Sequence, residues 1–261
     1  LIATGDEQAG LDAARDLVMA PDADIATHLE YALLLAGTGR EEEARAMLLP
    51  YASGDTVVPG AVRTLGVLDL DRGDLDAASK RFADLLATGV QSFDALYFLG
   101  VIAERRGDAD QALRHFTRVT GGEFMMPAQG RAARIRAKQG GLDAGLDALD
   151  QFARAHPQRG PDLVATRAGL AASLGDTVRA TRILDAGLAQ YPDSLDLRMA
   201  RVFAYERAGR GDAAIRELRQ LLAERPGDAT VQNALGYALA DRNKDLDEAA
   251  SLVSDALAQM P

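Results

Sequence analysis

Residues 72–82 read RGDLDAASKRF, and 34 positions later residues 106–116 read RGDADQALRHF. The two segments share a glycine–aspartate pair, an alanine five positions after the glycine and a phenylalanine four positions after that alanine. Agreement at a fixed spacing of this length is typical of repeated structural units. The pattern predicts one helix that ends at the glycine, which tolerates a left-handed backbone, and a second helix that the aspartate caps.

The same pattern extends along the chain, because the glycine recurs at intervals of 33 to 35 residues. A small residue five positions after it, and a larger, mostly apolar residue four positions further on, recur in the same phase. This phase predicts pairs of closely packed helices, and Asn243 continues the series because asparagine also tolerates the left-handed conformation. The predicted turn glycines are Gly5, Gly39, Gly73, Gly107, Gly140, Gly175 and Gly209.

A 34-residue unit with these features resembles the tetratricopeptide repeat. The resemblance implies an all-α fold, an α-solenoid of antiparallel helix pairs wound into a right-handed superhelix. It divides residues 1–261 into a partial repeat (1–24) and seven repeats that start near residues 25, 59, 93, 126, 161, 195 and 229. Neither end carries an atypical, polar capping repeat, so we expect a single array, truncated at both ends, whose uncapped ends are available for self-association.

Composition excludes some classes of function. The chain is 48% hydrophobic, has no cysteine and carries a net charge of −10. Residues 1–130 hold 21 acidic and 11 basic residues, whereas residues 131–261 hold 18 of each. An acidic chain is not attracted to a phosphate backbone, so we predict no nucleic-acid partner. No apolar run reaches the roughly 18–20 residues that a transmembrane segment requires.

The sequence contains no recognisable catalytic arrangement. His28, His115 and His156 lie in different repeats and lack a second ligand at metal-binding spacing. Phosphate-binding loops and nucleophile elbows are absent. The tripeptide Arg-Gly-Asp occurs three times, but always at a predicted helix junction, where the turn and the cap account for it. We therefore predict a protein that is not an enzyme and that has no catalytic residue, cofactor or metal site.

The resemblance also implies a binding surface, because in tetratricopeptide proteins the first helices of successive repeats line a concave groove for a partner protein or an extended peptide. Aromatic side chains in that groove would bury apolar groups of the partner, and arginines would hold its carboxylates. The aliphatic members suit packing between helices equally well, and the basic pair four residues apart is more typical of a solvated helix face. Transferred position by position, the groove residues are Arg63, Val67, Tyr97, Val101, Arg105, Gly130, Arg134, Lys138, Met199, Phe203, Arg207, Asn233 and Tyr237.

The last repeat carries a more specific resemblance. Residues 233–241 (NALGYALAD) and 246–249 (LDEA), with one extra residue in the turn between them, resemble a segment of long tetratricopeptide proteins of Gram-negative bacteria. These include outer-membrane lipoproteins that face the periplasm. One of them partners a carboxyl-terminal processing protease and helps to deliver cell-wall hydrolases to it. The resemblance implies an adaptor at the periplasmic face of the outer membrane, with a cytoplasmic location as the alternative.

Two other classes of protein share such repeats. A regulatory or substrate-recruiting domain of a larger enzyme, such as a glycosyltransferase, would have its catalytic domain outside this sequence. A helical repeat that binds single-stranded RNA would need a basic groove with base-reading side chains, which the net charge disfavours. We expect the first class, a non-catalytic scaffold that binds a protein or peptide.

Overall fold

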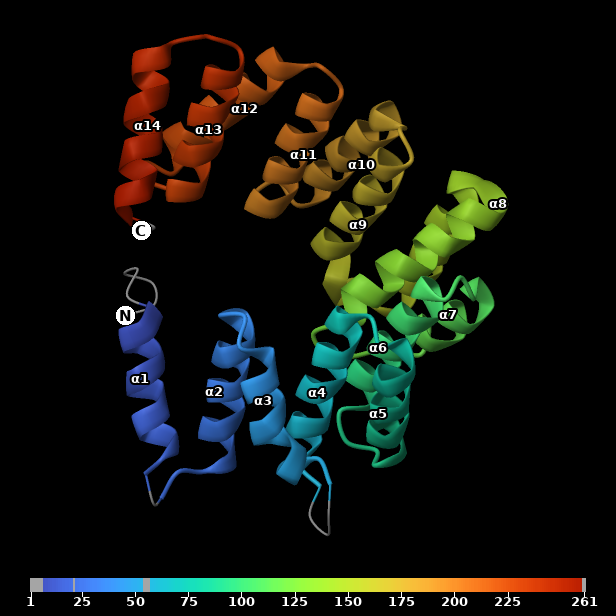
Figure 1. The fold of residues 1–261 in the computed structure, drawn as a ribbon. Coiled ribbons are helices and arrows are strands. Elements are labelled where there is room, and N and C mark those ends of the chain that lie inside the picture. Colours follow the sequence, from blue (N-terminus) through green and yellow to red (C-terminus); the bar gives the residue numbers. More distant parts are fainter. Residues whose placement is uncertain (1–6, 21, 54–56, 260–261) are drawn as a thin grey trace. The chain divides into compact units, whose positions relative to one another are not determined.

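The computed structural model describes residues 7–20, 22–53 and 57–259, in which 14 α-helices and no strand occur (Figure 1). Contacts group the chain into two compact units, Leu1–Ala132 (the N-terminal unit) and Ala133–Pro261 (the C-terminal unit). The boundary lies inside a predicted repeat, and the expectation of a single array stays a prediction. The predicted turn glycine Gly5 lies outside the described residues.

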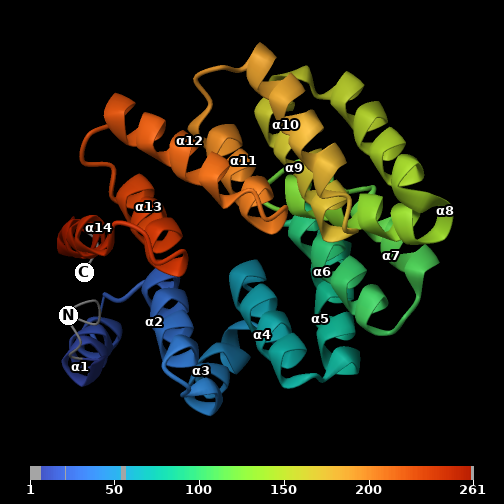
Figure 2. The same cartoon turned by 90° about the horizontal axis from the view of Figure 1, so that it is seen from above.

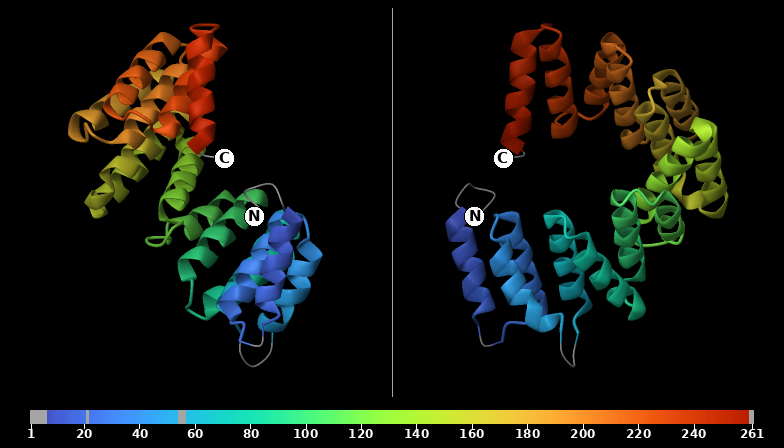
Figure 3. Two further views of the ribbon diagram at one scale, coloured as in Figure 1. Left: turned by 90° about the vertical axis from the view of Figure 1, so that its left-hand side faces the viewer. Right: turned by 45° about the vertical axis from the view of Figure 1, so that its right-hand side comes forward.

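The predicted all-α fold of antiparallel helix pairs is confirmed within each unit (Figure 3). The helices up to the unit boundary are α1 (Glu7–Val18), α2 (Ile25–Gly37), α3 (Glu41–Leu48), α4 (Pro59–Arg72), α5 (Leu75–Ala87), α6 (Ser92–Arg105) and α7 (Ala109–Phe116). They are followed by α8 (Met125–Ala155), α9 (Gly160–Ser173), α10 (Thr177–Gln190), α11 (Leu195–Arg207), α12 (Gly211–Glu224), α13 (Ala229–Asp241) and α14 (Leu246–Gln259). The even-numbered helices α2 to α8 and the odd-numbered helices α9 to α13 begin within one residue of the predicted repeat starts.

Most of the predicted turns have the expected backbone. Gly39, Gly73, Gly107, Gly175 and Gly209 all adopt positive φ values, between 69° and 87°. After three of these glycines an aspartate caps the next helix by accepting a hydrogen bond from a backbone N–H three residues on, as in Asp108 with the Gln111 amide at 2.8 Å.

The prediction for Gly140 is wrong, because the left-handed residue is Gly141, with φ 83° and ψ 167°. Other repeats carry a capping aspartate directly after the turn glycine, but here that position is Gly141. No side chain at residue 141 can cap the following helix, so nothing favours ending the first helix at Gly140. The two parts of α8 nevertheless pack closely. A Cβ atom on Gly145 would lie 2.6 Å from the carbonyl oxygen of Ala133.

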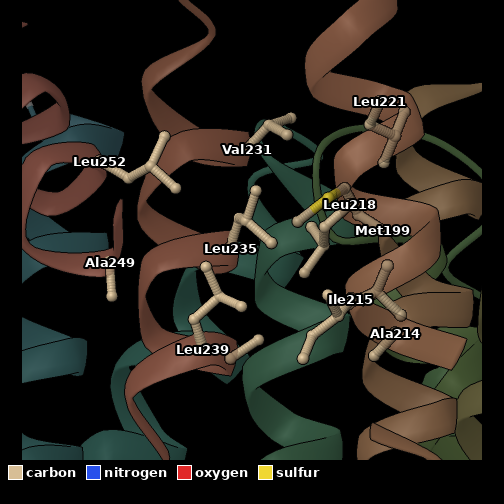
Figure 4. Packing of buried hydrophobic residues seen from close by; sticks show 12 residues of the cluster. Met199, Ala214, Ile215, Leu218, Leu221, Val231, Leu235, Leu239, Ala249 and Leu252 are labelled. Atoms are coloured by element: carbon tan, nitrogen blue, oxygen red, sulfur yellow. The ribbon is translucent and has the colours of Figure 1, made fainter. Parts of the chain in front are cut away.

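Small residues bring the helices of a pair together, and large apolar residues fill the space between pairs. Ala78 and Ala112 are completely buried, and a Cβ atom on Gly100 would lie 2.5 Å from the Phe116 ring. In the C-terminal unit, leucines from α12, α13 and α14 form a continuous core, in which Leu218 and Leu235 are fully buried (Figure 4). Burial of this aliphatic surface is the main stabilising contribution to the repeats.

Candidate binding groove

Three positions separated by 34 residues define the groove of the C-terminal unit. The helices α9, α11 and α13 are the first helices of successive pairs (Figure 2). Gly169 on α9, Phe203 on α11 and Tyr237 on α13 occupy equivalent places in them. The side chains of Phe203 and Tyr237 are 60% and 67% exposed, although the neighbouring residues Val202 and Leu235 are buried in the core. The helical period therefore turns two aromatic rings outward from a packed scaffold.

A pocket of about 450 Å³ lies between α11 and α13. Its volume is within the range of known ligand sites, and apolar side chains make up much of its lining. It is lined by Met199, Val202, Phe203, Glu206, Leu218, Thr230, Asn233, Ala234, Tyr237, Ala238, Asp241 and Arg242.

A second, smaller pocket of about 200 Å³ lies between α9 and α11 and shares Phe203 with the first. Its walls are built mostly from alanines, and Gly169 leaves it open, since no side-chain atom lies within 4 Å of the place where its Cβ would stand. The two pockets together are named the aromatic groove. Phe203 separates two hollows, each able to receive an apolar side chain.

The charged groups at the edge of the groove are partly neutralised by one another. Arg242 forms an ion pair with Glu206, donates a hydrogen bond to the Ala238 carbonyl oxygen at 3.2 Å and lies 3.4 Å from the Asp241 carboxylate. Arg207 is exposed, and its guanidinium lies 3.5 Å from the carbonyl oxygen of Ala172. The groove therefore combines an apolar floor with a charged edge that can orient a polar backbone.

The structure brings together the sequence-predicted residues of the last two repeats. Met199, Phe203, Asn233 and Tyr237 line the larger pocket, while Phe203 and Arg207 line the smaller one. That these residues bind a partner stays a prediction.

The contribution of α9 to the groove was not predicted from the sequence. Ala165 and Gly169 lie 34 residues before Met199 and Phe203, and both line the smaller pocket. The repeat spacing could have identified them, but small residues carry no binding chemistry of their own. Their contribution is the space that they leave beside Phe203.

In the N-terminal unit, the ring of Tyr97 packs against side chains of the same unit, and its role in binding a partner stays a prediction. The ring is half-buried and stacks on Phe124, with 4.4 Å between ring centroids. The guanidinium of Arg131 lies 5.9 Å from the Tyr97 ring centroid and donates a hydrogen bond to Glu104 at 2.6 Å. Side chains of the same unit thus cover part of the Tyr97 ring.

Arg63 is similarly engaged. Its Nε lies 3.0 Å from the Asp94 carboxylate, and its Nη2 donates to Glu123 at 2.8 Å. Burial raises the pKa of Asp94, and the positive charge of Arg63 opposes that rise. Both carboxylates compete with any partner for this guanidinium.

The remaining predicted groove residues have mixed environments. Val101 is 8% exposed and belongs to the core, in agreement with the packing alternative for the aliphatic members, and Val67 and Gly130 are half-buried. Arg105 donates a hydrogen bond to the Leu70 carbonyl oxygen at 2.7 Å. Arg134 and Lys138 are exposed on α8.

Two further observations concern the described ranges only. Within these ranges, no group of three or more histidine, aspartate or glutamate side chains is placed to hold a metal ion. None of the described helices has both the length and the apolar character needed to cross a membrane.

Comparisons with known proteins agree with this geometry. Two family models described as tetratricopeptide repeat match residues 63–122 and 171–236. The chain is 32% identical over 161 residues to the TPR repeat-containing protein PA4667 of Pseudomonas aeruginosa. The match covers 61% of this chain and 27% of that relative. The chain therefore contains tetratricopeptide repeats and spans about a quarter of the relative's length.

A solved structure shows the same fold. A tetratricopeptide repeat protein from Parabacteroides merdae superposes with a TM-score of 0.50 at 14% identity, covering 95% of this chain and 93% of that one. TTC0263, a TPR protein of Thermus thermophilus, superposes with a TM-score of 0.45 at 23% identity, covering 70% of this chain and all of that one.

Proposed function

We propose that this array of tetratricopeptide repeats is a non-catalytic scaffold that binds an extended segment of a partner protein in the aromatic groove. Proteins built from such repeats generally act as scaffolds for protein–protein interaction. The observation that carries the proposal is the exposure of Phe203 (60%) between two hollows. A large exposed ring beside an apolar pocket is typical of interaction sites, where aromatic anchors dominate the binding free energy.

The shape of the groove indicates what binds there. Its two hollows share one ring, so a ligand that fills both presents two apolar side chains, one to each hollow. Asn233 and Thr230 line the larger hollow and can form hydrogen bonds with the ligand's backbone. An extended peptide with apolar side chains separated by polar ones meets these requirements.

The proposal is tested by selecting peptides from a displayed random library against the chain and measuring their affinities by fluorescence anisotropy. We expect Phe203→Ala to weaken binding by about tenfold or more, as for an interface anchor. Gly169→Leu should also weaken binding, because its Cβ would have no neighbour within 4 Å and the rest of the side chain would occupy the smaller hollow.

A matched control is Val178→Ala, which removes a side chain that is 69% exposed on α10, outside the lining of both pockets. The control should bind as the unmodified chain does. Selected peptides that bind all three variants equally would contradict the proposed groove.

We further propose that the partner is a carboxyl-terminal processing protease of the bacterial envelope and that the chain acts at the periplasmic face of the outer membrane, recruiting substrates. The support is the resemblance of residues 233–241 and 246–249 to periplasmic tetratricopeptide lipoproteins. The test measures how fast the purified protease of the same genome degrades a cell-wall hydrolase, with and without this chain. Faster degradation that Phe203→Ala reduces is expected, and an unchanged rate together with no co-sedimentation contradicts the protease proposal.

A further inference from the structure

A third pocket of the C-terminal unit lies where the end of α8, α9 and α10 meet, and its volume of about 570 Å³ exceeds that of the two pockets of the aromatic groove. Its apolar walls come from residues such as Leu163, Val164 and Ile183. Two glycines, Gly160 and Gly187, leave room for the side chains of Tyr191 and Val164. A Cβ atom at Gly187 would lie 2.3 Å from Val164. The pocket is therefore a built feature of the helix packing, and it is named the arginine pocket for the residues described next.

The charged residues that line this pocket are all basic. Arg167, Arg179 and Arg182 line it together with His156, and no aspartate or glutamate is among the lining residues. In a chain with 39 acidic and 29 basic residues, such segregation is unusual. The larger pocket of the aromatic groove differs, since two carboxylates and one guanidinium line it.

The three guanidinium groups are accessible to a ligand to different degrees. Arg182 is exposed, and no carboxylate of the described residues forms an ion pair with it. Arg179 pairs with Asp143 at 2.5 Å and Arg167 with Asp150 at 3.0 Å. Because Asp143 and Asp150 are themselves 75% and 40% exposed, a ligand carboxylate can replace them at modest cost.

We infer that the arginine pocket binds a short acidic segment of a partner protein, with one apolar side chain of that segment inside the pocket and the flanking carboxylates on the arginines. Charge complementarity favours an anionic ligand, and planar guanidinium groups bind carboxylates with two parallel hydrogen bonds. The apolar walls require that the ligand also present a hydrophobic group. An acidic peptide with an embedded aliphatic residue supplies both.

This site is separate from the aromatic groove, because α9 contributes a different face to each. Residues 160, 163, 164 and 167 line the arginine pocket, whereas residues 165, 168, 169 and 172 line the smaller hollow of the groove. Both sets follow helical spacing, so they lie on two faces of the same helix. The inference therefore does not depend on what the aromatic groove binds.

The test uses a fluorescein-labelled octapeptide that carries two aspartates on each side of one leucine, and it measures binding to the full chain by anisotropy. We expect saturable binding that weakens at high salt, that drops about tenfold or more with Arg182→Glu, and that drops similarly with Ala186→Trp. Ala186 is exposed and lines the pocket, so tryptophan there fills the site without entering the core.

Two control variants make the test specific. Arg216→Glu changes an exposed arginine of α12 in the same way, and Ala189→Trp places the same ring on α10 at an exposed position outside the pocket lining. Both should bind as the unmodified chain does. Circular dichroism of all four variants checks that each is folded.

Several results would overturn the inference. Equal loss of binding in Arg182→Glu and Arg216→Glu would mean that the peptide responds only to overall charge. Undiminished binding of a peptide with serine in place of leucine would remove the role of the apolar walls. Displacement of the peptide by an equal concentration of inorganic pyrophosphate would assign the pocket to small anions instead. Loss with Phe203→Ala but not with Arg182→Glu would place the peptide in the aromatic groove.

Discussion

Val101, Phe203 and Tyr237 occupy the same position of three repeats and have opposite environments. Val101 in the N-terminal unit is 8% exposed, whereas Phe203 and Tyr237 in the C-terminal unit are 60% and 67% exposed. One helical turn earlier, Tyr97 stacks on Phe124, while its equivalent Met199 is buried in the core and lines the pocket between α11 and α13. Equivalent positions of a repeat therefore do not have equivalent roles.

The difference arises from side chains outside the repeat pattern. Phe124 and Glu123 lie in the connection between α7 and α8. Phe124 stacks on the ring of Tyr97, and Glu123 accepts a hydrogen bond from the guanidinium of Arg63. Described residues of the C-terminal unit leave Phe203 between two hollows. At these positions, side chains of the N-terminal unit pack on one another, whereas Phe203 and Tyr237 of the C-terminal unit are exposed.

The largest expected difference is between the effects of replacing Tyr97 and Phe203 on the free energy of unfolding. Tyr97→Ala should lower the free energy of unfolding by about 2–3 kcal/mol, because it removes a half-buried ring from a stacked cluster. Phe203→Ala should change it by no more than about 0.5 kcal/mol, as expected for an exposed side chain. Urea-induced unfolding followed by circular dichroism measures both.

The comparison between the units would fail if both variants were equally destabilised. That result would mean that Phe203 is held by packing and is not available to a ligand. A destabilised Tyr97→Phe variant would in turn show that the hydroxyl, not the stacked ring, supports the cluster.

The next largest effect is expected where a helix glycine lies against a buried ring. Gly100→Ala should destabilise the N-terminal unit by about 1–2 kcal/mol, because the added methyl group would lie 2.5 Å from the Phe116 ring. Fluorescence is of little use here, since the chain has no tryptophan. Hydrogen exchange of α6 and α7 amides locates the loss, and unchanged protection there would contradict the close approach.

The sequence predicted the helix pairs well and the binding surface only in part, for physical reasons. Turn glycines and capping aspartates act locally, so Gly107 and Asp108 reveal their roles without tertiary information. Gly140 and Gly141 show the limit, because two adjacent glycines tolerate the same backbone and local rules do not choose between them.

Exposure of groove residues depends on contacts that periodicity does not encode. Nothing in the 34-residue pattern indicates that Phe124 stacks on Tyr97, since Phe124 lies in a connection. The open hollow at Gly169 was missed for a related reason, because a missing side chain gives no chemical signal. Sequence periodicity predicts which residues share a face, and tertiary packing decides which of them remain exposed.

Gly169→Ala provides the counterpart to Gly100→Ala. No side-chain atom lies within 4 Å of the new Cβ, and glycine in a helix interior is less favourable than alanine by about 0.5–1 kcal/mol. The variant should therefore stabilise the C-terminal unit by up to that amount, measured as an increase in the urea midpoint. A lower midpoint would show that the smaller hollow is already occupied by neighbouring side chains.

The smallest expected effect is on the pH dependence of stability, to which one aspartate of each unit contributes with opposite sign. Burial raises the pKa of Asp94 in the N-terminal unit, whereas a hydrogen bond from Lys244 lowers the pKa of Asp212 in the C-terminal unit. A carboxyl with a raised pKa binds its proton more tightly in the folded state, so the penalty for its charge is present at neutral pH and disappears as the pH falls.

Compared with Asp94→Asn, the unmodified chain should therefore gain stability as the pH falls from neutral toward the ordinary aspartate pKa of about 4. Compared with Asp212→Asn, it should lose stability as the pH falls below that value, because the favourable ion pair requires the charged carboxylate. Urea midpoints of the three chains at matched pH values measure both differences, and taking differences cancels the titration of all other groups. If the two slopes had the same sign, Arg63 would be the dominant influence on Asp94 in place of burial. The surface of the N-terminal unit would then be held by an ion pair of the same kind as Lys244–Asp212.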